Sequence, residues 1–211
     1  MSVNVGAPKL VRWRDRDVLT SIFKNPVEGP VAVQGVNITG DDQADRTVHG
    51  GPDKAVYAYA REDLGWWSDG LGAPLQSGVF GENLTLAGVQ VTEAVIGERW
   101  RINDVLLEVC GPRVPCYKLG IRIGQDGFPR LFAAVGRPGA YLRILEAGTL
   151  AAGDDLLLEH RPTHGVTVHA VDEAYHRDRS RTAEILAAPE LAEVWQRWAR
   201  SLIDRGRTPK T

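Results

Sequence analysis

Short apolar runs separated by glycine, proline, asparagine and aspartate fill the chain from about Pro30 to Glu159. Runs of this kind are typical of a compact sheet or barrel with tight connections. Helical spacing interrupts the pattern at Arg61–Ser68 and at Pro129–Val135, where Pro129 suits a first helical turn. We therefore predict a region rich in β-structure but not purely β, with strands at Val31–Val36, Ala55–Tyr59, Asn83–Leu86, Trp100–Ile102, Val105–Val109, Ala140–Leu145 and Leu156–Glu159.

The pattern changes near Thr163. Beyond this residue glycine becomes rare, the density of charge rises, and apolar residues recur at three- and four-residue steps. Pro189 and Gly206 flank one such stretch as typical helix start and stop signals. Residues 163–211 are therefore expected to form a subdomain of two or three helices. Its aromatic stripe is expected to pack as core or docking surface, and it comprises Leu191, Val194, Trp195, Trp198 and Leu202.

Composition narrows the classes of partner. A net charge of −2 over 211 residues gives no electrostatic footprint for nucleic acid or an anionic membrane, so neither is expected as a partner. The sequence has no signal-peptide pattern and no long apolar run, which predicts a cytoplasmic protein. Two cysteines are too few for an iron–sulfur cluster, and the glycine-rich motifs of nicotinamide and flavin sites are absent from the sequence.

The most informative chemistry lies at Cys116, within the segment Gly-Pro-Arg-Val-Pro-Cys-Tyr-Lys at residues 111–118. Pro112 and Pro115 restrict the backbone, which predicts a stiff loop. Arg113 and Lys118 favour the thiolate, which is the form of cysteine that binds metals and attacks electrophiles. The alternative is a small buried hydrophobe, as most free cysteines are. Cys110, at the end of an apolar strand, fits that alternative better, while the local chemistry leaves both open for Cys116.

A polar, glycine-containing loop precedes the strand predicted at residue 55. Gly50 and Gly51 allow close approach of backbone amides to a ligand, and His49 and Lys54 add positive charge. These groups could hold a phosphate or another oxyanion. A glycine turn carrying solvated charges is the alternative, and this loop alone does not decide between them.

Two further loops carry candidate residues. Glu82 and Asn83 lie between a glycine and an apolar strand, where they could bind the polar edge of a heterocycle, or Glu82 could simply face water. Arg137 lies between Gly136 and Pro138, and arginine is the usual fork for a phosphate, although a solvated arginine is the more common case.

Four motifs occur in a fixed order along the chain: Gly-Asp-x-Gln-Ala-Asp at 40–45, His-Gly-Gly-x-Asp-Lys-Ala-Val at 49–56, Phe-Gly-Glu-Asn-Leu at 80–84, and Gly-Pro-Arg-x-Pro-Cys-Tyr-Lys-Leu at 111–119. Together they resemble the MOSC domain, named for the C-terminal domain of molybdenum cofactor sulfurase. The resemblance extends to the branch of bacterial 6-N-hydroxylaminopurine resistance proteins, in which a short helical tail follows this domain. It implies an α+β fold with a mostly β, barrel-like core at residues 28–162 and the helical subdomain at 163–211.

The resemblance also implies a function. It implies that the chain binds molybdenum cofactor (molybdopterin) with Cys116 as the metal ligand, and that it reduces N-hydroxylated bases to amines. A separate electron-donating reductase, expected to contain flavin, would then be the partner. Cys116, His49 and Lys54 are the predicted catalytic residues. The predicted cofactor-binding residues are Gly50, Gly51, Asp53, Glu82, Asn83, Arg113, Tyr117, Lys118 and Arg137. The alternative is a non-catalytic carrier of the cofactor or of persulfide sulfur on Cys116.

Overall fold

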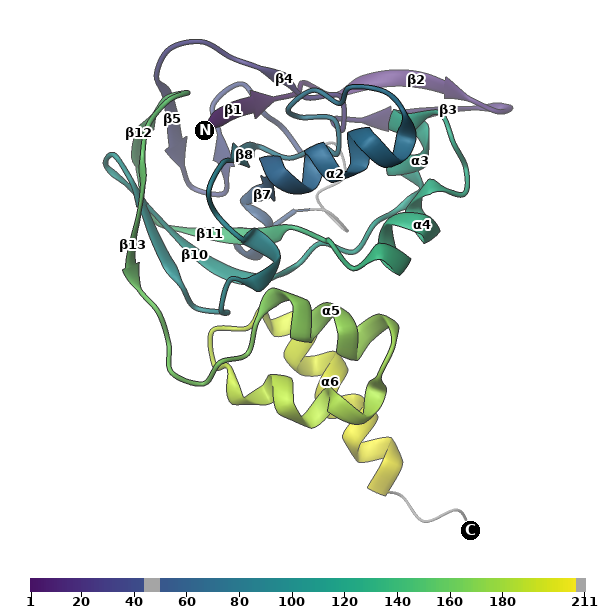
Figure 1. The fold of residues 1–211 in the computed structure, drawn as a ribbon, viewed down its shortest axis with the longest axis vertical. Helices are drawn as coiled ribbons and strands as arrows, with labels where there is room; N and C mark the ends of the chain where they lie inside the picture. The colour runs from purple at the N-terminus through teal and green to yellow at the C-terminus, as the bar shows by residue number, and fades with distance from the viewer. Residues whose placement is uncertain (44–49, 208–211) are drawn as a thin grey trace.

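The computed structural model describes residues 1–43 and 50–207 as a mixed α+β fold (Figure 1). Its strands are β1 (Ser2–Val5), β2 (Lys9–Trp13), β3 (Arg16–Thr20), β4 (Asn25–Pro26), β5 (Val31–Gln34), β6 (Asn37–Ile38), β7 (Val56–Ala60), β8 (Leu84–Leu86), β9 (Arg99–Ile102), β10 (Val105–Pro112), β11 (Ala140–Glu146), β12 (Gly148–Leu150) and β13 (Leu156–His160). Its α-helices are α2 (Arg61–Leu71), α3 (Tyr117–Ile123), α4 (Phe128–Val135), α5 (Val168–His176) and α6 (Glu193–Arg207), and its 3₁₀ helices are η1 (Pro52–Lys54), η2 (Val91–Glu93) and η3 (Arg179–Ala187).

The largest sheet in the described part of the chain has eight strands in the order β13-β9-β10-β11-β7-β8-β1-β4. Neighbouring strands are antiparallel except β7 and β8, which are parallel. β12, β5 and β6 form a smaller sheet, and β2 and β3 form a separate ribbon. No closed barrel is found among these strands, so the barrel-like form expected from the family resemblance is not confirmed.

The central strands are buried on both faces. Every residue of β7 and of β10 is buried, which explains why both read as continuous apolar runs rather than as alternating patterns. The first strand, β1, pairs with β8 and β4 and therefore belongs to this sheet, although it precedes the predicted domain start at residue 28. The predicted limits of the two domains stay a prediction.

Buried apolar side chains of the described residues form two clusters. The main cluster joins the large sheet to the helices after residue 163. The aromatic cluster lies among α2, α3, α4 and the sheet, and it contains Tyr59, Trp67, Phe80, Leu119, Phe128 and Phe132. Stacked and edge-to-face rings fill it, as in Trp67 and Phe132, whose ring centroids lie 5.6 Å apart and whose planes are nearly parallel.

The predicted helical tail is present as α5, η3 and α6, which pack on the β10 side of the large sheet (Figure 1). Thr167 caps α5, since its side-chain oxygen accepts a hydrogen bond from the amide of Ala170. The amide of Ala192 donates to the carbonyl of Cys110 over 2.8 Å, which ties the start of the last helix to β10. The helical tail thus lies directly behind the strand that leads to Cys116.

Candidate functional site

Cys116 lies in the connection between β10 and α3. The chain leaves the strand at Pro112, remains irregular through residues 113–116, and begins the helix at Tyr117. The backbone of Cys116 is extended, and its carbonyl accepts a hydrogen bond from the amide of Leu119. The side chain is half-buried, so the thiol is held between two regular elements and still reaches the surface of a cavity.

The first cavity, here called the cationic cavity, has a volume of about 110 Å³. Four basic side chains line it together with Cys116, namely Lys24, Lys54, Arg113 and Lys118. They come from three separate parts of the chain. Carboxylates of Asp41 and Asp42 also reach the cavity, so its positive charge is only partly balanced.

Arg113 is the most deeply placed of these cations, with 6% of its surface exposed. Its guanidinium carbon lies 5.1 Å from the centre of the Tyr57 ring. Burial opposes its charge, but the neighbouring Tyr57, Tyr141 and Cys116 raise its pKa on balance, so the guanidinium stays charged beside the thiol.

Two buried polar atoms of the cationic cavity are left without a hydrogen-bond partner among the described residues. They are Nη1 of Arg113 and Oγ of Ser21. A buried donor without an acceptor is costly, and such groups are normally satisfied by a ligand, an ion or water. Together with the four cations and the thiol, these donors fit an anionic, phosphate-bearing cofactor whose metal accepts a soft sulfur ligand.

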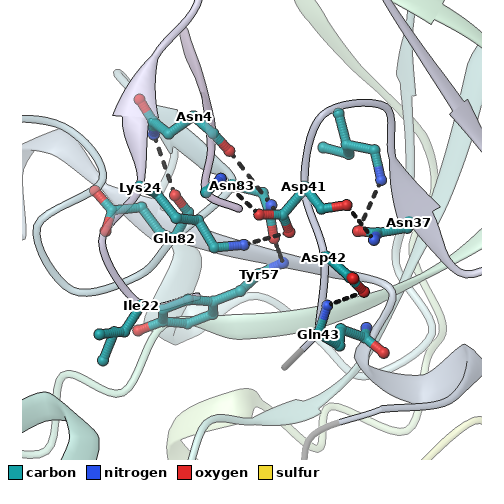
Figure 2. Close-up of polar contacts among 12 residues, drawn as sticks. Asn4, Ile22, Lys24, Asn37, Asp41, Asp42, Gln43, Tyr57, Glu82 and Asn83 are labelled. Carbon is teal, nitrogen blue, oxygen red and sulfur yellow. Dashed lines mark hydrogen bonds and ion pairs between the residues drawn. The ribbon is translucent and has the colours of Figure 1, made fainter. Parts of the chain in front are cut away.

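A buried polar network holds one side of this cavity (Figure 2). Nζ of Lys24 donates to Oδ2 of Asp41, which also accepts from Nδ2 of Asn83 over 2.8 Å. Asn83 in turn accepts from the amide of Tyr57 and donates to the carbonyl of Asn4. Asn83, which is predicted to contact a cofactor, therefore lines the cavity, and its side-chain amide links β7 to β1 through hydrogen bonds.

Glu82 does not line the cationic cavity. Its side chain is fully buried, and its carboxylate accepts hydrogen bonds from the amides of Gly78 and Phe80 and from the hydroxyl of Thr85. Burial raises the pKa of Glu82, and these hydrogen bonds oppose the shift. These hydrogen bonds show that Glu82 stabilises the loop at residues 78–83, from which Gly81 and Asn83 line the cavity. Contact between Glu82 and a cofactor stays a prediction.

Cys116 also lines a second cavity, of about 340 Å³, here called the aromatic cavity. Its walls include Pro112, Pro115 and three aromatic residues of the helical tail, Tyr175, Trp195 and Trp198. The two cavities share four residues at their boundary, Lys54, Val114, Cys116 and Tyr141.

The ionisation of the shared residues follows from their burial. Burial lowers the pKa of Lys54, and the nearby carboxylate of Asp53 opposes the shift. Burial raises the pKa of Tyr141, although Arg113 opposes this, so the phenol stays protonated. The boundary between the cavities thus holds a half-buried thiol, an ammonium group and a neutral hydroxyl.

Cys110 has the structural role that its strand position predicts. Its side chain is fully buried, and Sγ lies within hydrogen-bond distance of the backbone carbonyls of Asp53 and Tyr141, either of which can accept its single proton. Burial raises the pKa of this thiol far above its ordinary value, so Cys110 stays a neutral thiol.

The other predicted site residues lie at several places. Gly50 and Gly51 precede η1, and Gly51 has a φ of 99°, in the region that favours glycine. Asp53, in η1, pairs with Arg143 and lines the aromatic cavity. Tyr117 is exposed, and its ring faces Arg16. Arg137 pairs with Asp63 at a different cavity.

His49 lies outside the described residues. Within residues 1–43 and 50–207, no group of three or more histidine, cysteine or acidic side chains is placed to hold a metal. No helix in this part of the chain is long and apolar enough to cross a membrane.

Several site residues carry no signal that sequence reasoning could have used. Lys24 and Ser21 come from the segment between β3 and β4, which has no recognisable motif and lies far from Cys116 in the sequence. Tyr141 lies within a predicted strand. Trp195 and Trp198 were expected as core or docking surface, and the aromatic spacing gave no indication that they line a cavity beside Cys116.

The sequence was compared with models of known protein families. Residues 45–157 match the model of the MOSC domain, which is more than half of the chain. The chain belongs to the MOSC domain family. The matched region contains the glycine loop, the Phe-Gly-Glu-Asn-Leu element and the Cys116 segment, and it ends before the helical tail.

Relatives of this MOSC protein include curated proteins and solved structures. YflK of Bacillus subtilis is 35% identical over 93% of this chain and 90% of its own length, and YiiM of Escherichia coli is 30% identical over 84% and 82%. A protein of Gibberella moniliformis named "Reductase" is 31% identical over 69% of this chain, but the match spans only 27% of that protein. The crystal structure of YiiM from Geobacillus stearothermophilus has a TM-score of 0.78 and 29% identity, with 95% of this chain and 96% of that chain covered.

Proposed function

We propose that this MOSC protein is a molybdenum-cofactor-dependent reductase that converts N-hydroxylated bases or related compounds, such as 6-N-hydroxylaminopurine, to the amine. One observation supports the proposal above the others: Cys116 and Lys54 lie at the boundary between a cationic cavity and an aromatic cavity. This arrangement offers one cavity for a charged cofactor and another for an organic substrate, with Cys116 lining both.

The residues of the cationic cavity would hold the cofactor. Lys24, Arg113 and Lys118 would bind its phosphate, with the unpaired Nη1 of Arg113 and Oγ of Ser21 as hydrogen-bond donors. Cys116 would ligate molybdenum as a thiolate, a form favoured by the charge of Arg113. When bound, the cofactor supplies the two-electron chemistry that cleaves the N–O bond.

The overall reaction consumes two protons and two electrons, since R–NHOH becomes R–NH₂ and H₂O. Among the described residues we assign proton delivery to Lys54, because it lines both cavities together with Cys116 and burial lowers its pKa. His49 is the other predicted donor and lies outside the described residues. Histidine titrates near neutral pH and suits this role.

The electrons must come from another protein, because the sequence has no flavin or nicotinamide motif and too few cysteines for an iron–sulfur cluster. A separate reductase, expected to contain flavin, is therefore part of the proposal. We infer that it delivers electrons to the bound cofactor.

The proposal is tested by comparing two cysteine variants made in a host that synthesises the cofactor. Cys116→Ser is expected to lose most of its bound molybdenum and at least a hundredfold in reductase activity, measured with a chemical electron donor. Cys110→Ser is the matched control, because a hydroxyl can still donate to the carbonyl acceptors of the buried thiol. Full activity in Cys116→Ser would refute the proposal.

The half-buried position of Cys116 also suits a carrier of cofactor or persulfide sulfur, which is the alternative function. The same experiment separates the two. A wild-type protein that binds molybdenum but reduces no N-hydroxylated compound, and whose metal-free form can be trapped with a persulfide on Cys116, would identify the carrier.

A further inference from the structure

Three aromatic rings of the helical tail form one wall of the aromatic cavity. Tyr175 comes from α5, and Trp195 and Trp198 come from α6. The ring of Tyr175 contacts both indoles edge-to-face, with centroid separations of 5.1 Å, and the two indoles lie 6.0 Å apart. These mutual contacts fix the rings in place before any ligand arrives.

Only part of this wall is buried in the core. Trp195 is 8% exposed and belongs to the main cluster, whereas Tyr175 and Trp198 are half-buried and Val194 beside them is 49% exposed. Part of this aromatic wall therefore packs on the sheet, and the rest leaves apolar surface facing the cavity.

Gly111 brings this wall close to β10. A Cβ atom added at Gly111 would lie 2.7 Å from Nε1 of Trp195, so glycine is needed for the indole to rest on the strand. Nε1 has no hydrogen-bond acceptor among the described residues, which leaves a donor beside the cavity.

Polar residues line the same cavity. Oδ1 of Asp53 accepts from Nε of Arg143, which fixes the carboxylate at the cavity wall, and Lys54 lies next to it. A cavity of about 340 Å³ with aromatic and proline walls and a few fixed polar groups has the character of a small-molecule site. Flat rings with polar edges match it, because aromatic faces stack on them and the polar groups orient their edges.

We propose that the aromatic cavity binds the planar heterocyclic ring of the N-hydroxylated substrate, with Trp198 and Tyr175 against the ring and the N-hydroxyl group directed toward Cys116 and Lys54. This inference rests on the proposed function and assigns the recognition of substrate to the helical tail. It predicts a preference for aromatic N-hydroxylated compounds over aliphatic ones.

Two variants test the proposal. Trp198→Ala removes a ring from the wall, and Val194→Trp fills the cavity from a half-exposed position, where no core packing is lost. In cofactor-loaded protein, isothermal titration with 6-N-hydroxylaminopurine under non-turnover conditions, and with adenine as the amine product, is expected to give dissociation constants at least tenfold higher in both variants. The molybdenum content per chain is expected to stay at the wild-type value.

Trp13→Ala is the matched control, since Trp13 lies in the β2–β3 ribbon and lines neither cavity. N-methylhydroxylamine, which has no ring, is the control substrate. Its kcat/KM is expected to fall less than threefold in Trp198→Ala, while that of 6-N-hydroxylaminopurine falls at least tenfold.

Unchanged dissociation constants in Val194→Trp would overturn the proposal. So would a loss of molybdenum in step with the loss of purine binding, because the cavity would then belong to the cofactor. If the wild type binds adenine and Val194→Trp does not, but neither reduces an N-hydroxylated compound, the ring site stands and the proposed reductase function fails.

Discussion

Nζ of Lys24 lies 2.5 Å from Oδ2 of Asp41, and the two side chains are 10% and 3% exposed. Asp41 also accepts from the amide of Gly6 and from Nδ2 of Asn83, so one carboxylate joins three segments that are distant in sequence. The pair both shapes the cationic cavity and supplies one of its cations. A buried ion pair of this kind is costly to break from one side only, because the remaining group loses its opposite charge.

Lys24→Met is therefore expected to lower the free energy of unfolding by about 3 kcal/mol, measured by urea denaturation. The double variant Lys24→Met/Asp41→Asn removes both charges and is expected to recover at least half of this loss. Equal denaturation midpoints for Lys24→Met and the wild type would show that the pair does not stabilise the fold.

The pH dependence of the proposed reductase activity should report the ionisation of Lys54. Its pKa is lowered by burial, and Lys54 can donate a proton only while it is protonated. The wild-type kcat is therefore expected to be maximal below this pKa and to fall above it, with a midpoint below about 10.4, the ordinary value for lysine. Lys54→Arg keeps the positive charge, but arginine cannot deprotonate in this range. The kcat of this variant is therefore expected to be at least tenfold lower and to show no fall at high pH (no alkaline limb).

Lys118→Arg is the control for this pH profile, because it alters another cation of the same cavity. It is expected to retain the alkaline limb. An identical limb in wild type and Lys54→Arg would assign the proton transfer to a different group.

Gly111→Ala should displace the helical tail. The added methyl group would lie 2.7 Å from Nε1 of Trp195, closer than van der Waals contact allows, and the indole is packed too tightly to move freely. We expect a loss of about 1–3 kcal/mol in unfolding free energy, as for other overpacked sites, and weaker binding of purines.

Gly65→Ala provides the comparison for this glycine variant. Gly65 lies within α2, and an added Cβ there would have no atom within 4 Å. The substitution is expected to raise stability by up to about 1 kcal/mol through helix propensity. A Gly111→Ala protein as stable as the wild type would show that the indole does not rest on β10 in solution.

The strands that the sequence predicts are those whose apolar runs are buried on both faces or bounded by turn residues. β7, β9, β10 and β11 start and end within a few residues of their predicted limits. The predicted stiff loop at residues 111–118 overlaps only the first two residues of α3, and no helix was predicted there because Pro112 and Pro115 dominate the local pattern and α3 has only seven residues. The sequence pattern did not predict β1 and β4, because each strand is short and is stabilised mainly by pairing with distant strands.

The candidate site could be predicted only where its residues form local motifs. Arg113, Cys116 and Lys118 lie within one octapeptide, so their shared cavity follows from their proximity in sequence. Lys24 and Tyr141 reach the same cavity through sheet pairing, and no local pattern carries that information. Arg137 also lies in a local motif, between Gly136 and Pro138, but its side chain pairs with Asp63 and lines a different cavity.

The loop that carries Cys116 connects the two apolar clusters. β10 on one side is anchored in the main cluster, and Leu119 of α3 on the other side is anchored in the aromatic cluster. Small cooperative units of a protein can open without global unfolding. We expect opening of the aromatic cluster to release α3 and misplace the thiol before the main cluster opens. The geometry around Cys116 is therefore expected to be lost on heating before the protein unfolds globally.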